Sequence, residues 1–277
     1  MSENDATVTG RDIDQAIERL GIAGSPVCLH ASLSSFGQVD GGADTVIDAF
    51  LRSGCTLLVP TFTGEQLEVN PSEDQLLERN GWDVIEARRL PPRTDMVFTP
   101  DLNLIDASMG AISAAVLQRP ERLRGDHPHN SFAAIGPKAK DLIEEQAWND
   151  VYAPLRELTK QNGYIVLAGV GLNRMTILHL AETLAGRRLF RRWVTGPDGN
   201  AVAVPIGGCS GGFPNLKTVL GLLTRETTVG ASRWRAFPSA EVVTTAAAVI
   251  RNDPGITHCG DPECIRCPHA IAGGPEL

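Results

Sequence analysis

The feature that most constrains the fold is an apolar strand followed by a polar loop, a helix and a second apolar strand. Pro26–His30 (PVCLH) is short and apolar, the loop ASLSSFGQVDGGAD follows, a helix is expected at 43–52, and Cys55–Pro60 (CTLLVP) completes the unit. Two strands joined through a helix run parallel, with a right-handed crossover. A third buried strand is expected at 164–168. The chain is therefore predicted to have an α/β fold.

The remaining expected elements fit one domain. Thr9 is expected to cap the first helix, and residues 64–107, with four prolines, are expected to form an irregular insertion. Helices are expected at 12–20, 73–89, 109–117, 137–146, 154–161, 214–223 and 239–251, a strand at 131–135, and a hairpin formed by 187–194 and 201–206. We predict a single domain over 1–277. It is a layered α/β/α sandwich with a mostly parallel central sheet and a β-rich C-terminal part (186–277) that carries a cysteine-rich tail.

Charge and composition narrow the class of protein. The 277 residues carry a formal net charge of −8, and the pI is about 5.3. An acidic surface attracts cations, and no basic stripe of the kind that binds nucleic acid is present. The start MSENDATVTG lacks the features of a signal peptide, and no apolar run reaches membrane-spanning length. We expect a cytoplasmic protein without nucleic-acid or membrane partners.

A histidine and a glutamate three residues apart are the first candidate for chemistry. In GVGLNRMTILHLAE, His179 and Glu182 lie on one face of an expected helix, with Thr176 one turn earlier. A carboxylate that holds one ring nitrogen leaves the other free to accept a proton, as a general base does. Taken alone, such a pair is more often a surface pair or a satisfied core histidine.

The loop after the first strand is a candidate ligand site. Its small residues allow a ligand to approach the backbone, and the amides at the start of the next helix can hold a phosphate. The loop matches neither common phosphate-binding motif, so a plain polar loop between strand and helix is the alternative.

Three blocks carry a resemblance to a known family. Across about residues 26–185, the chain resembles the aminoglycoside 3-N-acetyltransferase family in three blocks that occur in the family's order. The blocks are HASLSSFGQVDGGADTVIDAFL with GCTLLVPTFT, then MGAISAAVLQRPERLRGDHPHNSFAAIGPKA, then APLRELTKQNGYIVLAGVGLNRMTILHLAE. Members of this family, which is associated with antibiotic resistance, transfer acetyl from acetyl-CoA to an amine of an aminoglycoside. The resemblance implies that His179 is the essential histidine and Glu182 its carboxylate. It further implies a cofactor site formed by His30, Ser32, Leu33, Ser34, Ser35, Phe36, Gly37, Thr61, Thr63, Met109, Gly110 and Arg124.

These residue types suit acetyl transfer. An ammonium group is not a nucleophile, so the acceptor must lose a proton, which His179 could remove while Glu182 orients the ring. Backbone amides of the 33–37 loop could stabilise the oxyanion. Direct transfer in a ternary complex is expected, because no cysteine falls at the matching catalytic positions.

The acceptor half departs from the family pattern. A polycationic acceptor requires carboxylates, for which Asp101, Asp106 and Asp126 are candidates, and Thr176 is a further candidate for binding the acceptor. For each aspartate, a solvated loop charge is the alternative. The segment FTPDLNLIDASMG differs from the family phrase at this place. A different small amine, or a different acyl donor, is therefore the main alternative. A homodimer is a further expectation.

The cysteine-rich tail suggests a structural metal. HCGDPECIRCPH places Cys259, Cys264 and Cys267 at spacings that match part of a structural zinc site, with Cys209, His258 or His269 as the fourth ligand. A cluster of reduced thiols is the alternative. A metal-dependent hydrolase that uses this tail and the pair His127 and His129 is a less favoured function.

Overall fold

The computed structural model describes residues 7–82 and 84–276, and the acidic start of the chain lies outside these ranges. The helices are α1 (Gly10–Leu20), α2 (Gly42–Arg52), α3 (Gly64–Leu67), α4 (Val84–Ala87), α5 (Gly110–Gln118), α6 (Ala139–Ile143), α7 (Ala153–Lys160), α8 (Ile177–Leu184), α9 (Lys217–Gly221), α10 (Ser239–Asn252) and α11 (Arg266–Ile271). The strands are β1 (Pro26–Ala31), β2 (Thr56–Pro60), β3 (Glu68–Val69), β4 (Leu123–Arg124), β5 (Phe132–Ile135), β6 (Tyr164–Ala168), β7 (Phe190–Thr195), β8 (Ala201–Ile206), β9 (Arg225–Val229) and β10 (Ser232–Pro238).

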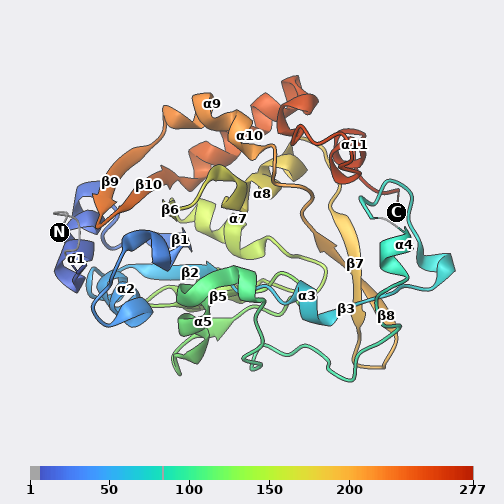
Figure 1. Cartoon of the computed structure of the whole chain (residues 1–277), viewed down its shortest axis with the longest axis horizontal. Coiled ribbons are helices and arrows are strands. Elements are labelled where there is room, and N and C mark those ends of the chain that lie inside the picture. Colours follow the sequence, from blue (N-terminus) through green and yellow to red (C-terminus); the bar gives the residue numbers. More distant parts are fainter. Residues whose placement is uncertain (1–6, 83, 277) are drawn as a thin grey trace.

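A seven-stranded sheet in the order β4-β5-β2-β1-β6-β10-β9 forms the centre of the molecule (Figure 1). Strand β1 pairs in parallel with β2 and with β6, as the unit at 26–60 predicts. The outer pairings, β4 with β5, β5 with β2, β6 with β10 and β10 with β9, are all antiparallel. The prediction of a mostly parallel sheet is therefore wrong outside the central three strands, because the outer strands reverse direction instead of crossing over.

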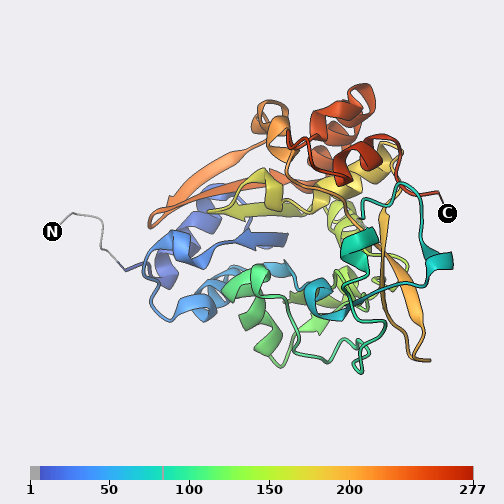
Figure 2. The same cartoon turned by 45° about the vertical axis from the view of Figure 1, so that its right-hand side comes forward.

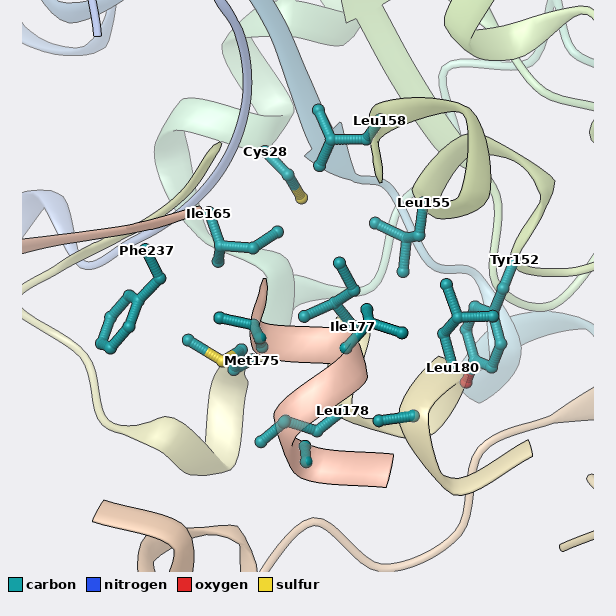
Figure 3. Close-up of a cluster of buried hydrophobic side chains, with 14 of the residues drawn as sticks. Cys28, Tyr152, Leu155, Leu158, Ile165, Met175, Ile177, Leu178, Leu180 and Phe237 are labelled. Carbon is teal, nitrogen blue, oxygen red and sulfur yellow. The ribbon is translucent and has the colours of Figure 1, made fainter. Parts of the chain in front are cut away.

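Two hydrophobic clusters divide the side chains of the central strands. In β1, Val27 and Leu29 belong to one cluster with residues of α1, α2 and α5, whereas Cys28 belongs to the other with residues of α7, α8 and α10. Figure 3 shows the second cluster, in which Ile177 and Leu178 of α8 lie among side chains from α7 and β6. Central strands buried on both faces read as continuous apolar runs, which explains why they were predictable.

A second, three-stranded sheet in the order β3-β7-β8 lies at the end of the molecule opposite α1 (Figures 1 and 2). The expected hairpin forms it, with Phe190 opposite Ile206 and Thr195 opposite Ala201. The C-terminal part contains β7 to β10 but also α9, α10 and α11. Within residues 7–82 and 84–276, no helix is long and apolar enough to cross a membrane.

The helix expected at 73–89 is not formed as predicted. A short turn at Glu73–Gln75 and the four-residue α4 lie there instead. Arg79 and Gly81 take positive φ angles of 54° and 58°, which break a helix. Tertiary contacts stabilise this path, because the Asn80 side chain bonds the backbone of Arg191 in both directions.

Candidate active site

His179 and Glu182 form a buried pair on α8. The Nδ1 atom of His179 lies 2.7 Å from Oε2 of Glu182, and the two residues are 8% and 5% exposed. Helix α8 follows β6, the strand that pairs with β1, so the pair lies beyond the carboxyl end of the parallel strands. This is the edge at which ligands bind in open α/β sheets. With Nδ1 engaged, Nε2 is the ring atom available to a substrate.

Arg187 extends this pair into a buried triad. Its guanidinium Nη1 bonds Oε1 of Glu182 and the hydroxyl of Thr257, the latter at 2.8 Å, and Nη2 donates to the carbonyl of Pro254 at 2.6 Å. Sequence reasoning missed Arg187, although it stands only five residues after Glu182. The Arg187 guanidinium thus pairs with the same buried carboxylate that contacts Nδ1 of His179, and a negative charge at this place stabilises the positive charge that the ring gains when it takes a proton.

Aromatic rings fix the plane of the imidazole. The Tyr152 ring stacks on His179 at 6.3 Å with an interplanar angle of 7°, and the Phe213 ring lies 4.8 Å away. A Cβ atom at Gly207 would lie 2.5 Å from Cδ2 of His179 and 2.6 Å from the Tyr152 hydroxyl oxygen. Glycine at 207 is therefore the residue that allows its loop to pass so close to the ring.

A cavity of about 560 Å³ opens beside His179. Eight of the predicted site residues line it: His30, Ser32, Leu33, Ser34, Met109, Gly110, Thr176 and His179. Side chains not predicted from the sequence also line it, among them Phe62, Asn130, Asn173 and Arg174. The structure therefore brings together segments that lie more than a hundred residues apart in the chain.

The turn after β1 forms one wall of this cavity. Leu33–Phe36 is a 3₁₀ turn in which the Ser35 hydroxyl donates to the Ser32 carbonyl at 2.6 Å and lies 2.9 Å from the Ser232 hydroxyl. Phe36 points into the core against Trp234, at 5.3 Å. Ser35, Phe36 and Gly37 thus lie outside the cavity lining and hold the turn. The first amides of a helical turn have no partner inside it, so those of Leu33 and Ser34 are the ones suited to an oxyanion.

Three predicted cofactor residues, Thr61, Thr63 and Arg124, do not line the cavity. Thr61 and Thr63 are fully buried and bond the backbone of Ser131 and Pro128. The Arg124 guanidinium donates to the carbonyls of Thr61, Leu102 and Leu104 at 2.5–2.9 Å. Burial lowers the pKa of Arg124 to about 10. Arg124 therefore links the 102–104 segment to Thr61, the residue that follows β2.

The three candidate acceptor carboxylates do not line the cavity. Asp106 is buried and accepts from the amide of Glu65 at 3.2 Å, and burial raises its pKa. Asp126 accepts from the Trp148 indole at 3.0 Å. Asp101 is exposed, and its carbonyl accepts from Arg122. Their proposed role toward an acceptor stays a prediction.

The two histidines of DHPHN make local contacts. Nδ1 of His127 accepts from the amide of Asn130 at 2.9 Å, and Nε2 of His129 lies 3.2 Å from Glu68. Within the described ranges, the one group that could hold a metal ion is Cys209, Cys259, Cys264 and Cys267. These contacts favour a structural role for the histidine pair over metal binding.

His30 is a cavity residue held in its neutral form. Burial lowers its pKa to about 4, with the nearby Arg174 adding to the effect, and Nε2 lies 3.6 Å from the Cys28 sulfur. Burial likewise lowers the pKa of His127 to about 3. A neutral imidazole of this kind can donate or accept one hydrogen bond to a ligand without changing charge near neutral pH.

The lowered pKa values of His30 and His127 predict that the folded protein loses stability in acid. An unfolded histidine has a pKa near 6.5, so below that pH the unfolded chain binds protons that the folded chain does not bind until about pH 4. The urea midpoint of unfolding should fall as the pH falls from 6.5 to 4.5, and His30→Gln should make this fall smaller. An unchanged slope in His30→Gln would contradict the buried neutral state.

Comparisons with known proteins identify the class. An α/β fold with a histidine–carboxylate pair at the wall of a cavity is typical of an enzyme. The sequence model of the family described as aminoglycoside 3-N-acetyltransferase matches residues 28–251. Aminoglycoside N(3)-acetyltransferase IX of Micromonospora chalcea is 32% identical over 203 residues, which cover 70% of this chain and 68% of that protein. The chain therefore belongs to the aminoglycoside 3-N-acetyltransferase family of acyltransferases, and the resemblance inferred from the three blocks is confirmed.

Solved structures share this fold. The apoenzyme of aminoglycoside acetyltransferase AAC(3)-IVa has a TM-score of 0.78 at 24% identity, covering 98% of this chain and 100% of that chain. AAC(3)-Xa has a TM-score of 0.72 at 28% identity, covering 90% and 94%. AAC-IIIb, solved with CoASH, has a TM-score of 0.70 at 22% identity, covering 89% and 97%.

Proposed function

We propose that this protein transfers acetyl from acetyl-CoA to the 3-amino group of an aminoglycoside, with His179 as the general base. The main support is the buried His179–Glu182–Arg187 array, in which His179 lines the same cavity as the 32–34 turn. Family membership supports the acyl transfer, and the CoASH complex of AAC-IIIb supports the donor. The alternative of a metal-dependent hydrolase gains no support from the histidines.

The proposed reaction is a direct transfer. Nε2 of His179 removes a proton from the acceptor ammonium, and the freed nitrogen attacks the thioester carbonyl. A C–N bond forms, the C–S bond breaks, and the second proton of the attacking nitrogen goes to the departing thiolate of CoA. The charge that develops on the carbonyl oxygen requires donors, and the amides of Leu33 and Ser34 are the candidates. Among the described residues lining the cavity there is no cysteine, in keeping with transfer without an acetyl-cysteine intermediate.

The identity of the acceptor has a second candidate. An aminoglycoside is a polycation, yet the described residues that line the cavity include no aspartate or glutamate and do include Arg174. This lining suits the donor better than a polycation, so carboxylates outside it would have to bind an aminoglycoside. A small amine with fewer charges is therefore the second candidate acceptor.

A panel of acceptors tests the proposal. Release of CoA thiol from acetyl-CoA would be followed with aminoglycosides that carry or lack a free 3-amino group, and with simple diamines and amino sugars. We expect turnover only with acceptors that bear the 3-amine. Turnover confined to the diamines would favour the second candidate, and CoA binding without turnover on any amine would contradict acetyl transfer to amines.

A further inference from the structure

Four thiols from two distant parts of the chain meet at one point. Cys209 lies in the loop after β8, whereas Cys259, Cys264 and Cys267 lie between α10 and the end of the chain. Their four sulfur atoms all lie within 4.8 Å of one another, and those of Cys264 and Cys267 are 3.6 Å apart. All four are free thiols. We propose that they hold a zinc ion that ties the loop after β8 to the C-terminal segment.

The geometry and chemistry of the cluster fit this metal. Four thiolates around zinc at about 2.3 Å place the sulfur atoms roughly 3.8 Å apart. Backbone amides already point at two of the sulfurs: Gly211 donates to Cys209, and Cys259 donates to Cys267, each at 3.4 Å. Such donors stabilise metal-bound thiolates. A Cβ atom at Gly211 would lie 2.8 Å from Cβ of Cys259, so glycine allows the two segments to meet.

The two histidines that could have served as ligands are engaged elsewhere. Nδ1 of His258 accepts from the amide of Gly260, and Nδ1 of His269 accepts from the amide of Gly81, both at 3.0 Å. A set of four cysteines leaves no open coordination position, so the metal is structural. Figures 1 and 2 place α11, the helix that begins just before Cys267, beside the ends of α8 and α10.

The cluster adjoins the residues that hold His179 from two sides. Gly207, Gly208 and Ser210 line the cavity on either side of Cys209, and Phe213 packs on the His179 ring. The segment just before Cys259 supplies Thr257 and Pro254, which bond Arg187. A bound metal would therefore fix the loop around Cys209 against the His179 imidazole. It would also fix the segment that bonds Arg187, the partner of Glu182. Only this effect on turnover rests on the proposed function, whereas the metal site itself does not.

The first test measures the metal directly. Protein produced without a His tag would be analysed for zinc and iron, and for its spectrum after replacement of zinc by Co²⁺. We expect one zinc per chain, no iron, and the visible bands of tetrahedral cobalt–thiolate. Cys264→Ser should lose the metal, whereas His258→Ala, in the same tail, and Cys55→Ala, in the core, should keep it. Protein without zinc, with iron in its place, or with full zinc in Cys264→Ser would overturn the site.

The second test measures the effect of zinc on stability and turnover, and it does not depend on any variant folding. Zinc would be removed from the wild-type protein with a chelator and then restored. We expect a lower melting temperature and a roughly 10-fold loss of turnover in the apo form, both reversed by zinc. Unchanged turnover in the apo form would overturn the positioning effect. If no acceptor is turned over at all, the proposed function fails, and metal content and melting temperature still decide the metal site.

Discussion

Replacement of His179 by alanine is expected to lower turnover roughly a thousandfold while leaving CoA bound with nearly its normal affinity. The imidazole is the group on α8 that can take the proton of the acceptor ammonium, because Glu182 holds Nδ1 and leaves Nε2 free. Without this base, the enzyme depends on the small fraction of acceptor that is already a free amine. The residual rate of His179→Ala should therefore rise with pH. Steady-state kinetics between pH 6 and 9 and calorimetric titration with CoA measure both effects.

Two controls keep this result specific. His129→Ala removes a half-buried histidine that does not line the cavity, and it should retain most of the activity. The melting temperature of His179→Ala should stay close to that of the wild type. Near-normal turnover in a folded His179→Ala protein would rule out His179 as the base.

Glu182→Leu is expected to have the largest effect on stability as well as a strong effect on turnover. It leaves the guanidinium of Arg187 buried without its carboxylate, which typically costs about 3–5 kcal/mol of unfolding free energy. It also releases the His179 ring, so turnover should fall roughly a hundredfold. Urea unfolding and steady-state kinetics of the variant measure the two losses separately.

The double variant Glu182→Leu with Arg187→Leu separates packing from chemistry. Removing both charges should recover much of the lost stability, because no unpaired buried ion remains. Turnover should stay low, because the carboxylate that orients His179 is still absent. Recovery of turnover together with stability would show that Glu182 acts only by keeping the protein folded.

The central part of the fold was predictable because local and tertiary preferences agree there. Residues 164–168 were expected as a strand, and β6 is Tyr164–Ala168. The hairpin of β9 and β10 was missed because its strands, RETTV and SRWRAFP, place charged residues among the apolar ones. Only the fold shows that Trp234 packs against Phe36 while Arg233 faces outward to Glu226. This hairpin forms one of the two antiparallel edges of the sheet, and β4 and β5 form the other.

The sequence predicted the parts of the site whose residues lie close together in the chain. It did not predict contacts between residues that only the fold brings together. The spacing of His179 and Glu182 indicated their contact, and the family resemblance indicated the turn at 32–34. Tyr152, Phe213 and Gly207 could not be found in this way, because nothing in their local sequence indicates that they pack around one ring. For Arg124 the family resemblance predicted a cofactor contact, but its guanidinium bonds backbone carbonyls and does not line the cavity.

The position of the acetyl group in the product shows whether the enzyme acts on the 3-amine of an aminoglycoside. The wild-type enzyme would be incubated with acetyl-CoA and an aminoglycoside that carries several free amines, and the product would be analysed by mass spectrometry and two-dimensional NMR. We predict a single monoacetylated product with the acetyl group on the 3-amine. Acetylation at another amine, or no acetylated aminoglycoside from protein that binds CoA, would contradict acetyl transfer to the 3-amine.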